Sequence, residues 1–140
     1  MQLYNEDVNY SKYVILGVSW GGNDKIATCG EDGKYKIWDT FGRKLFESKA
    51  NQAPMTSVSF SPTSEFFLTG TFEAIKLCDQ SGPVSSSLQQ AKKGSIFRIC
   101  WSQDSMMALA GTGSGSVAKI DVGGLEIEDT THHINQVEIK

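Results

Sequence analysis

The chain has 140 residues, of which 13 are basic and 16 acidic, and its formal net charge is −3. This balance gives no basic surface for nucleic acid or anionic membranes, so we expect neither as a partner. Its 14 glycines and 3 prolines favour tight turns over disorder. The longest apolar stretch, residues 13–18, is too short to cross a bilayer, so we expect no membrane insertion.

The first third of the chain predicts four short strands joined by tight turns. A β-branched and aromatic run begins it, and turn residues follow at 21–24. The Asp32-Gly33 pair marks a hairpin because it readily supplies the positive φ angles of a tight turn. The predicted strands are residues 15–20, 25–29, 35–38 and 44–47.

The same order of strands recurs twice along the chain. The second unit predicts strands at residues 56–61, 66–71, 74–78 and 84–87. The third unit predicts strands at residues 96–102, 107–111 and 117–121. Its fourth strand has two candidate positions, residues 125–127 and residues 137–139. No segment shows a sustained helical period with caps, so the chain is predicted to be all-β.

A repeat of about forty residues underlies these three units. The pattern Asp-x-x-Gly begins at Asp39, Asp79 and Asp121, and an aromatic residue precedes each by about twenty positions: Trp20, Phe60 and Trp101. This period is typical of four-stranded propeller blades. Closed propellers commonly need four to eight blades. We therefore predict a β-propeller fragment of about three four-stranded antiparallel blades that does not form a closed ring.

The predicted organisation has three parts. Residues 1–14 form a lead-in, residues 15–122 hold three blades, and residues 123–140 form a divergent C-terminal tail that can supply a last strand. The blades are predicted at residues 15–47, 56–87 and 96–122. Three blades leave two open flanks. These flanks require missing blades, self-association or a protein partner to cover them.

The Trp38-Asp39 pair, preceded by residues 30–33, resembles a WD repeat. The second unit has Cys78 where the first has Trp38. The resemblance implies a buried polar network of Thr28, Asp32 and Trp38. The histidine that WD repeats often add to this network is missing from all three units, so we expect the networks to be incomplete.

A narrower resemblance covers roughly residues 15–121. Residues 30–39 with 41–43, 76–79 with Gly82, and 94–102 are similar to WD-repeat subunits of intraflagellar transport complex B, in their first propeller. The resemblance implies a non-catalytic protein-interaction scaffold for cilium assembly and transport. It implies a location at the cilium, ciliary base and cytoplasm, and other complex B subunits as partners. The alternative is a substrate-recruiting or adaptor module of another complex, such as a ubiquitin ligase.

The three cysteines Cys29, Cys78 and Cys100 are widely spaced and form no CxxC pair. Neither a zinc site nor a disulfide framework is expected from this spacing. We expect reduced, buried thiols.

Patterns that suggest chemistry have simpler interpretations. Gly111 to Ser116 looks like a phosphate loop but lacks the Lys-Ser/Thr ending and the following helix, so it predicts a hairpin. The adjacent His132 and His133 would point to opposite faces of a strand and rarely bind one ion together. Glu31-Asp32 lies in a turn signal, and the acidic run Glu126, Glu128 and Asp129 is expected on the surface. No motif joins an acid, a base and a nucleophile, so we expect no enzyme, no catalytic residues, no metal and no cofactor.

Aromatic and basic residues are the remaining candidates for binding. Core packing is favoured over a binding stripe for six aromatic residues, because the repeat places most of them on inner strands: Trp20, Phe60, Phe66, Phe67, Phe97 and Trp101. The pairs Arg43-Lys44 and Lys92-Lys93 are expected to be solvated loop charges. Arg98 interrupts an apolar strand at a position where the other units have Gly17 and Ser57, which places it near the mouth of a central channel.

Overall fold

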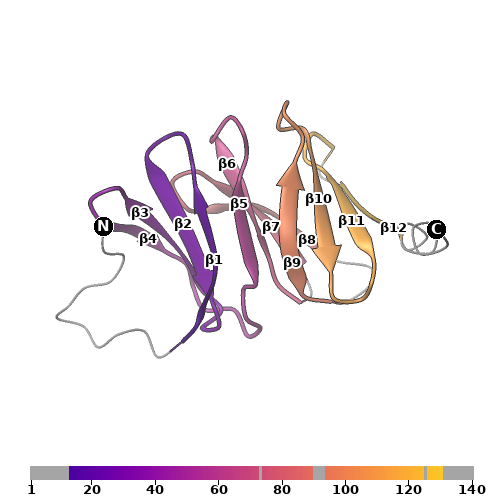
Figure 1. Cartoon of the computed structure of the whole chain (residues 1–140), viewed down its shortest axis with the longest axis horizontal. Helices are drawn as coiled ribbons and strands as arrows, with labels where there is room; N and C mark the ends of the chain where they lie inside the picture. The colour runs from indigo at the N-terminus through magenta and orange to yellow at the C-terminus, as the bar shows by residue number, and fades with distance from the viewer. Residues whose placement is uncertain (1–12, 73, 90–93, 125, 131–140) are drawn as a thin grey trace, which may run out of the picture.

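The computed structural model describes residues 13–72, 74–89, 94–124 and 126–130. These residues contain twelve strands and no helix, arranged as three antiparallel sheets of four strands. The sheets stand side by side in chain order and do not close into a ring (Figure 1). The predicted fold class, an open fragment of a β-propeller, is thereby confirmed.

Each sheet is a meander in which consecutive strands are neighbours. The first sheet contains β1 (Ile15–Trp20), β2 (Lys25–Gly30), β3 (Tyr35–Asp39) and β4 (Lys44–Glu47). The second sheet contains β5 (Ser57–Phe60), β6 (Phe66–Gly70), β7 (Ala74–Asp79) and β8 (Val84–Gln89). The third sheet contains β9 (Ile96–Trp101), β10 (Met107–Thr112), β11 (Val117–Asp121) and β12 (Glu126–Thr130).

The fourth strand of the third sheet forms from the beginning of the predicted tail. β12 pairs with β11 in antiparallel register, with Ile120 opposite Ile127. It overlaps the first of the two predicted positions, residues 125–127, and extends beyond it. The second position, residues 137–139, lies outside the described residues.

Turn chemistry explains where the strands end. Gly33 has a φ of 74° in the turn between β2 and β3, as the Asp-Gly signal predicts. The turn between the first two strands of each sheet holds a non-glycine residue near φ 60°: Asp24, Ser64 and Ser105. Asp and Ser tolerate this conformation better than β-branched residues do, since their short side chains can bond locally. The three turns therefore repeat in backbone geometry as well as in position.

Two hydrophobic clusters hold the three sheets together. The cluster between the first and second sheets centres on Phe67, whose ring lies 5.5 Å from that of Tyr35 and 5.3 Å from that of Phe60 between centroids. Phe46 packs at its rim, 5.9 Å from the Tyr35 ring. The cluster between the second and third sheets is aliphatic. Its buried members are Leu68, Ile75, Leu77, Ile96, Ile99, Ala108, Ala110, Ala118 and Ile120. The second sheet is therefore covered on both faces, and it is the centre of the fold.

Hydrogen bonds between sheets recur at a fixed spacing. The backbone N–H of Gly22 donates to the Ser64 hydroxyl at 2.7 Å, and the N–H of Thr63 donates to the Ser105 hydroxyl at 3.2 Å. Both serines are buried, at 7% and 3% exposure. Each bond fixes the first turn of one sheet to the first turn of the next, so these serines set how the sheets stack.

The polar network expected from the WD resemblance is only partly formed in the first sheet, and it is broken in the second. The indole N–H of Trp38 donates to the Thr28 hydroxyl at 2.9 Å. Asp32 instead accepts from the backbone N–H of Lys34 in the hairpin turn. In the second sheet Thr69 occupies the place of Thr28, but Cys78 stands where the indole would be. The Thr69 hydroxyl is fully buried and has no hydrogen-bond partner among the described residues.

Replacing Thr69 with valine is therefore expected to raise the free energy of unfolding by up to about 1 kcal/mol, because it removes an unsatisfied buried hydroxyl while keeping the side-chain volume. Thr28→Val is the matched control. It should lower stability by about 0.5–1.5 kcal/mol, because it removes the acceptor of the Trp38 indole. Urea unfolding of both variants measures the two effects. Equal destabilisation by both changes would contradict the conclusion that the Thr69 hydroxyl is unsatisfied while the Thr28 hydroxyl is hydrogen-bonded.

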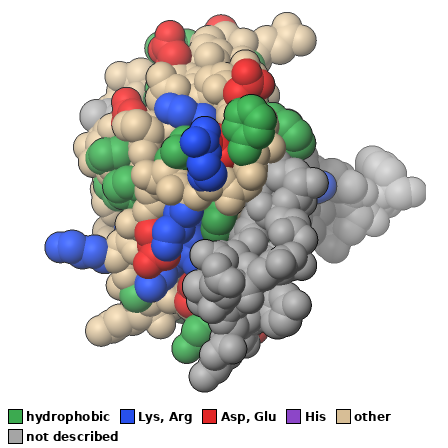
Figure 2. Space-filling model, turned by 90° about the vertical axis from the view of Figure 1, so that its left-hand side faces the viewer, with side chains coloured by type: hydrophobic (Ala, Val, Ile, Leu, Met, Phe, Trp, Pro, Cys, Tyr) green, Lys and Arg blue, Asp and Glu red, His purple; other side chains and the backbone are tan. Residues whose placement is uncertain are grey.

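The outer faces of the first and third sheets carry exposed apolar side chains. Trp20 is 63% exposed and Val18 61% on the first sheet, and Leu109 is 49% exposed on the third. Figure 2 looks onto the first of these faces and shows apolar side chains among charged ones. The core packing favoured for the six aromatic residues is wrong for Trp20 and for Phe97, which is 68% exposed. Trp20 lies on a face of the first sheet that no other sheet adjoins in the described structure, and Phe97 lies at the irregularity in register between β9 and β10.

Candidate protein-interaction groove

The first strands of the three sheets line a shared groove. β1, β5 and β9 each lie at one end of their sheet, and they contact one another in that order. The groove has a volume of about 360 Å³. Its lining residues are Leu16, Gly17, Val18, Ser19, Thr56, Ser57, Val58, Ser59, Phe97, Arg98 and Ile99. We call this feature the inner groove.

Edge strands form most of the inner groove, so backbone donors and acceptors are available along it. Each of β1, β5 and β9 has a neighbouring strand on one side only in the described part of the chain. Such strands present backbone donors and acceptors that can pair with an added segment. The hydroxyls of Ser19 and Thr56 are already used between sheets: Ser19 accepts from the N–H of Phe60 at 2.9 Å, and Thr56 donates to the Ile96 carbonyl.

Arg98 lines the inner groove, in agreement with its prediction near a channel mouth. Strand register places it opposite Gly111, as Ser57 is opposite Gly70 and Gly17 is opposite Cys29. The three positions are thus equivalent. Arg98 is exposed, and it forms no ion pair with another described residue.

Ser57 gives the groove a second unusual feature. Its side chain is 5% exposed, and its hydroxyl has no hydrogen-bond partner among the described residues. An unsatisfied buried hydroxyl costs about 1–3 kcal/mol, so natural structures rarely leave one without a reason. Neither the burial of Ser57 nor its missing hydrogen-bond partner can be predicted from the local sequence. A serine in a β-strand is common, and only the stacking of the sheets buries this one.

The glycine-rich run from Gly111 to Ser116 forms the end of β10 and the turn to β11, as predicted. The hydroxyls of Thr112, Ser114 and Ser116 hydrogen-bond to one another at 2.7 to 2.9 Å. Because the hydroxyls satisfy each other and no helix follows in the described residues, the run has the features of a hairpin rather than of a phosphate loop.

The charged candidates are dispersed over turns and edges. Arg43 pairs with Asp39 at 2.6 Å, and Lys44 pairs with Glu47 at 2.8 Å. Both carboxyl groups have lowered pKa values: hydrogen bonds from Lys44 and Lys34 bring the pKa of Glu47 to about 2, and hydrogen bonds from Arg43 outweigh the effect of burial on Asp39. Exposed pairs of this kind contribute little to stability.

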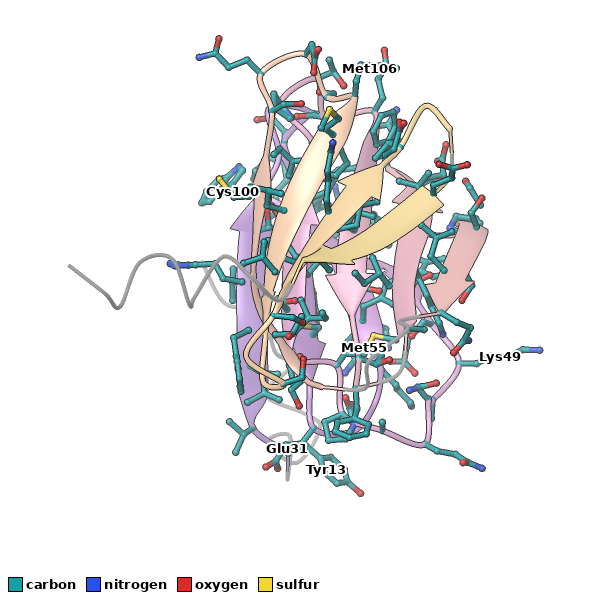
Figure 3. All side chains as sticks on the ribbon, turned by 90° about the vertical axis from the view of Figure 1, so that its right-hand side faces the viewer. Tyr13, Glu31, Lys49, Met55, Cys100 and Met106 are labelled. Carbon is teal, nitrogen blue, oxygen red and sulfur yellow. The ribbon has the colours of Figure 1, made fainter. Side chains whose placement is uncertain are left out.

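Several other candidates cannot be placed near the groove. Lys92, Lys93, His132 and His133 lie outside the described residues. Glu31 and Asp32 lie in the turn before β3, and Glu31 lies with Tyr13 at one end of the sheets (Figure 3). The described residues contain no group of three His, Cys, Asp or Glu side chains arranged to hold a metal ion. Nor do the described ranges contain a helix long and apolar enough to span a membrane.

The cysteines fall into two classes. Cys29 and Cys78 are buried, whereas Cys100 is exposed on β9, so the expectation of buried thiols is wrong for Cys100. Figure 3 shows Cys100 at the outer surface and Met55 among the strands. Burial, with a smaller contribution from Asp32, raises the pKa of the Cys29 thiol to about 12. Burial raises the pKa of Cys78 to about 11, against an opposing hydrogen bond with Tyr35.

Alkylation of the native chain at pH 8 is therefore expected to modify Cys100 first. Cys29 and Cys78 should react on the order of a hundredfold or more slowly, because the thiolate is the nucleophile and burial suppresses it. Iodoacetamide labelling followed by mass spectrometry should give one adduct in the native chain and three in urea. Rapid native labelling of all three thiols would contradict the packing between the first two sheets.

Sequence reasoning missed the inter-sheet serines Ser64 and Ser105. Their signal was available, since both follow a first strand at the same place in the repeat, 41 residues apart. It was not used because a serine beside a turn is common and its bonding partner is far away in the sequence. The inner groove had no sequence signal apart from Arg98.

Comparison with known proteins finds a WD-type repeat in this chain. The WD domain, G-beta repeat family matches residues 8–39. The intraflagellar transport protein 80 homologs of Rattus norvegicus and Mus musculus are each 43% identical to the chain over 105 residues. The matched region covers 74% of this chain and 13% of each relative, so the chain spans a small part of the curated relatives it matches. The resemblance drawn from the sequence is confirmed at this level.

Proposed function

We propose that this chain, which has a WD-type repeat and is similar to part of intraflagellar transport protein 80, is a non-catalytic protein-interaction scaffold. The observation that supports this best is the inner groove, which the first strands of three stacked sheets line together. Rigid sheets that position edge strands and loops are well suited to binding other proteins. The proposed role needs no chemical step.

The proposed setting follows from the similarity to the two transport protein homologs. The chain would act in cilium assembly and transport, with other subunits of intraflagellar transport complex B as partners. It would be found at the cilium, at the ciliary base and in the cytoplasm. The blade boundaries at residues 15–47, 56–87 and 96–122, with a tail at 123–140, remain our proposed division of the chain.

Affinity purification of the tagged chain from ciliated cells tests this function. We expect complex B subunits to be enriched over a tagged WD-repeat fragment of similar size from an unrelated protein. Recovery of ubiquitin-ligase subunits in their place would favour the adaptor alternative. Absence of any transport subunit, with the chain folded and expressed, would refute the proposed ciliary role.

A further inference from the structure

The outermost strand of the second sheet, β8, differs from the outermost strands of the other two sheets. β4 contains Lys44 and Glu47, and β12 contains Glu126, Glu128 and Asp129. β8, with the sequence Val-Ser-Ser-Ser-Leu-Gln, contains no charged residue. Natural edge strands often carry charges, because an uncharged edge can pair with another chain. β8 therefore lacks a feature that the equivalent strands have.

The strand register shows which position of β8 corresponds to an acidic residue. In the first sheet Glu47 lies opposite Lys36, with 3.8 Å between the carboxylate oxygen and the ammonium nitrogen. In the second sheet Ser87 lies opposite Lys76. Both lysines also lie opposite an equivalent threonine of the preceding strand. Ser87 thus stands where the first sheet has a carboxylate.

The third sheet has an acidic residue at this place as well. Ala118 takes the position of the two lysines, and Asp129 lies opposite it in register. The place on the outermost strand is therefore Glu, Ser and Asp in the three sheets in order. Phosphorylation makes a serine acidic, since a phosphoserine carries a charge of about −1.5 to −2 at pH 7 and three strong acceptor oxygens.

Lys76 lacks the counter-ion that its equivalent in the first sheet has. It is half-buried, and among the described residues it forms no ion pair. Residues directly opposite on antiparallel strands share a face and have Cβ atoms about 4.5–5.5 Å apart, so its ammonium can reach a group on the opposing serine oxygen. By contrast, Lys25 donates to the Gln80 side-chain oxygen, and Lys119 lies opposite Glu128.

Ser87 is accessible to an enzyme. Its side chain is exposed, and β8 pairs with β7 alone in the described part of the chain. Ser85 is also exposed, but it lies at the irregularity in register between β7 and β8 and has no lysine directly opposite. Ser86 is half-buried and lies opposite Leu77. Among the serines of β8, only Ser87 combines exposure with an opposing cation.

We propose that Ser87 is a phosphorylation site and that its phosphate is the counter-ion of Lys76. A protein kinase transfers the γ-phosphoryl group of a nucleoside triphosphate to the Ser87 oxygen. The bond from the γ-phosphorus to the bridging oxygen breaks, a nucleoside diphosphate leaves, and the hydroxyl proton passes to the base of the kinase. The product gives β8 the charge that β4 and β12 already have. This inference goes beyond the proposed scaffold function and does not depend on it.

Mass spectrometry of the full 140-residue chain tests whether the site is used. The tagged chain is purified from the ciliated cells with phosphatase inhibitors present, and Ser87→Ala is purified in parallel. We expect phosphate on Ser87 that alkaline phosphatase removes, and none on Ser85 or Ser86. Absence of phosphate from Ser87 would overturn the proposal. Equal phosphate on all three serines would also overturn it, because exposure of the run would then suffice as the explanation.

A chain with phosphoserine incorporated genetically at position 87 tests the role of Lys76. Phosphorus NMR follows the second ionisation of the phosphate, which has a pKa of about 6. A nearby cation favours the dianion, so Lys76→Met should raise this pKa by about 0.3–0.7. Phosphoserine at position 85 is the matched control and should not respond to the same substitution. An unchanged pKa at position 87, or equal changes at both positions, would overturn the pairing with Lys76.

Ser87→Glu tests the same contact without a phosphate. We expect it to raise the thermal midpoint by about 1–3 °C more in the unchanged chain than in Lys76→Met, because only the unchanged chain can form the ion pair. The same comparison for Ser85→Glu should show no difference. An effect of Ser87→Glu that is independent of Lys76 would contradict the contact. Failure of these tests would leave the proposed scaffold function standing, and loss of the ciliary partners would leave the phosphorylation site standing.

Discussion

Replacing Phe67 with alanine is expected to lower the free energy of unfolding by about 3–5 kcal/mol, the usual cost of removing a buried phenyl ring. Phe67 is fully buried between the first and second sheets. Its ring contacts Tyr35 edge-on at 5.5 Å and Phe60 at 5.3 Å. Typical domains have about 5–15 kcal/mol of stability in total. The variant should therefore lose a large share of its stability and unfold at a markedly lower temperature.

Thermal unfolding followed by circular dichroism measures this effect. Phe41→Ala is the matched control, since it removes the same ring from a turn where the side chain is 81% exposed. Among the described residues its ring contacts the guanidinium of Arg43 at 5.6 Å, and this contact is worth about 0.5–1 kcal/mol at an exposed site. Comparable losses in the two variants would mean that the aromatic cluster is not the core that stabilises the fold.

Replacing Gly70 with alanine is expected to cost about 1–3 kcal/mol, because the packing at this point has no space for another carbon. A Cβ atom there would lie 2.4 Å from the Cβ of Ile96 and 2.7 Å from both of its γ carbons. A change of rotamer moves the γ carbons but leaves the Cβ in place. The second and third sheets would have to separate, and urea unfolding should show a lower midpoint.

Gly111→Ala is the control for this prediction because the two glycines occupy the same place in their sheets, opposite Ser57 and Arg98 respectively. An added Cβ at Gly111 meets nothing within 4 Å. We expect stability to be unchanged or raised by about 0.4–1 kcal/mol, since alanine restricts the unfolded chain. Destabilisation equal to that of Gly70→Ala would show that another layer covers this flank in solution.

The exposed thiol of Cys100 can be used to test whether the outer face of the third sheet is covered in solution. The third sheet exposes Cys100 and Leu109 on the face that has no adjoining sheet in the described structure. Protection of Cys100 from alkylation at high protein concentration, but not at low concentration, would identify self-association through this face. The open flanks are thus measurable properties of the molecule, whatever partner finally covers them.

The local sequence determined the strands and their turns. β-branched runs, the Asp32-Gly33 hairpin and the forty-residue period placed the observed strands to within about two residues in nearly all cases, because these signals act over short distances. The period also identified equivalent positions, so that Arg98 could be matched to Gly17 and Ser57 from the sequence alone. Only the last strand was left open, since Glu126–Thr130 is polar and has little alternation of its own.

The tertiary structure alone decided which of these equivalent positions are covered. Trp20, Phe60 and Trp101 share one place in the repeat, yet Phe60 is buried while Trp20 is exposed, because a sheet adjoins one and not the other. The same reason separates Cys100 from the buried thiols. Burial in stacked sheets depends on whether a neighbouring sheet covers the residue. The sequence of one unit alone does not determine whether such a neighbour is present.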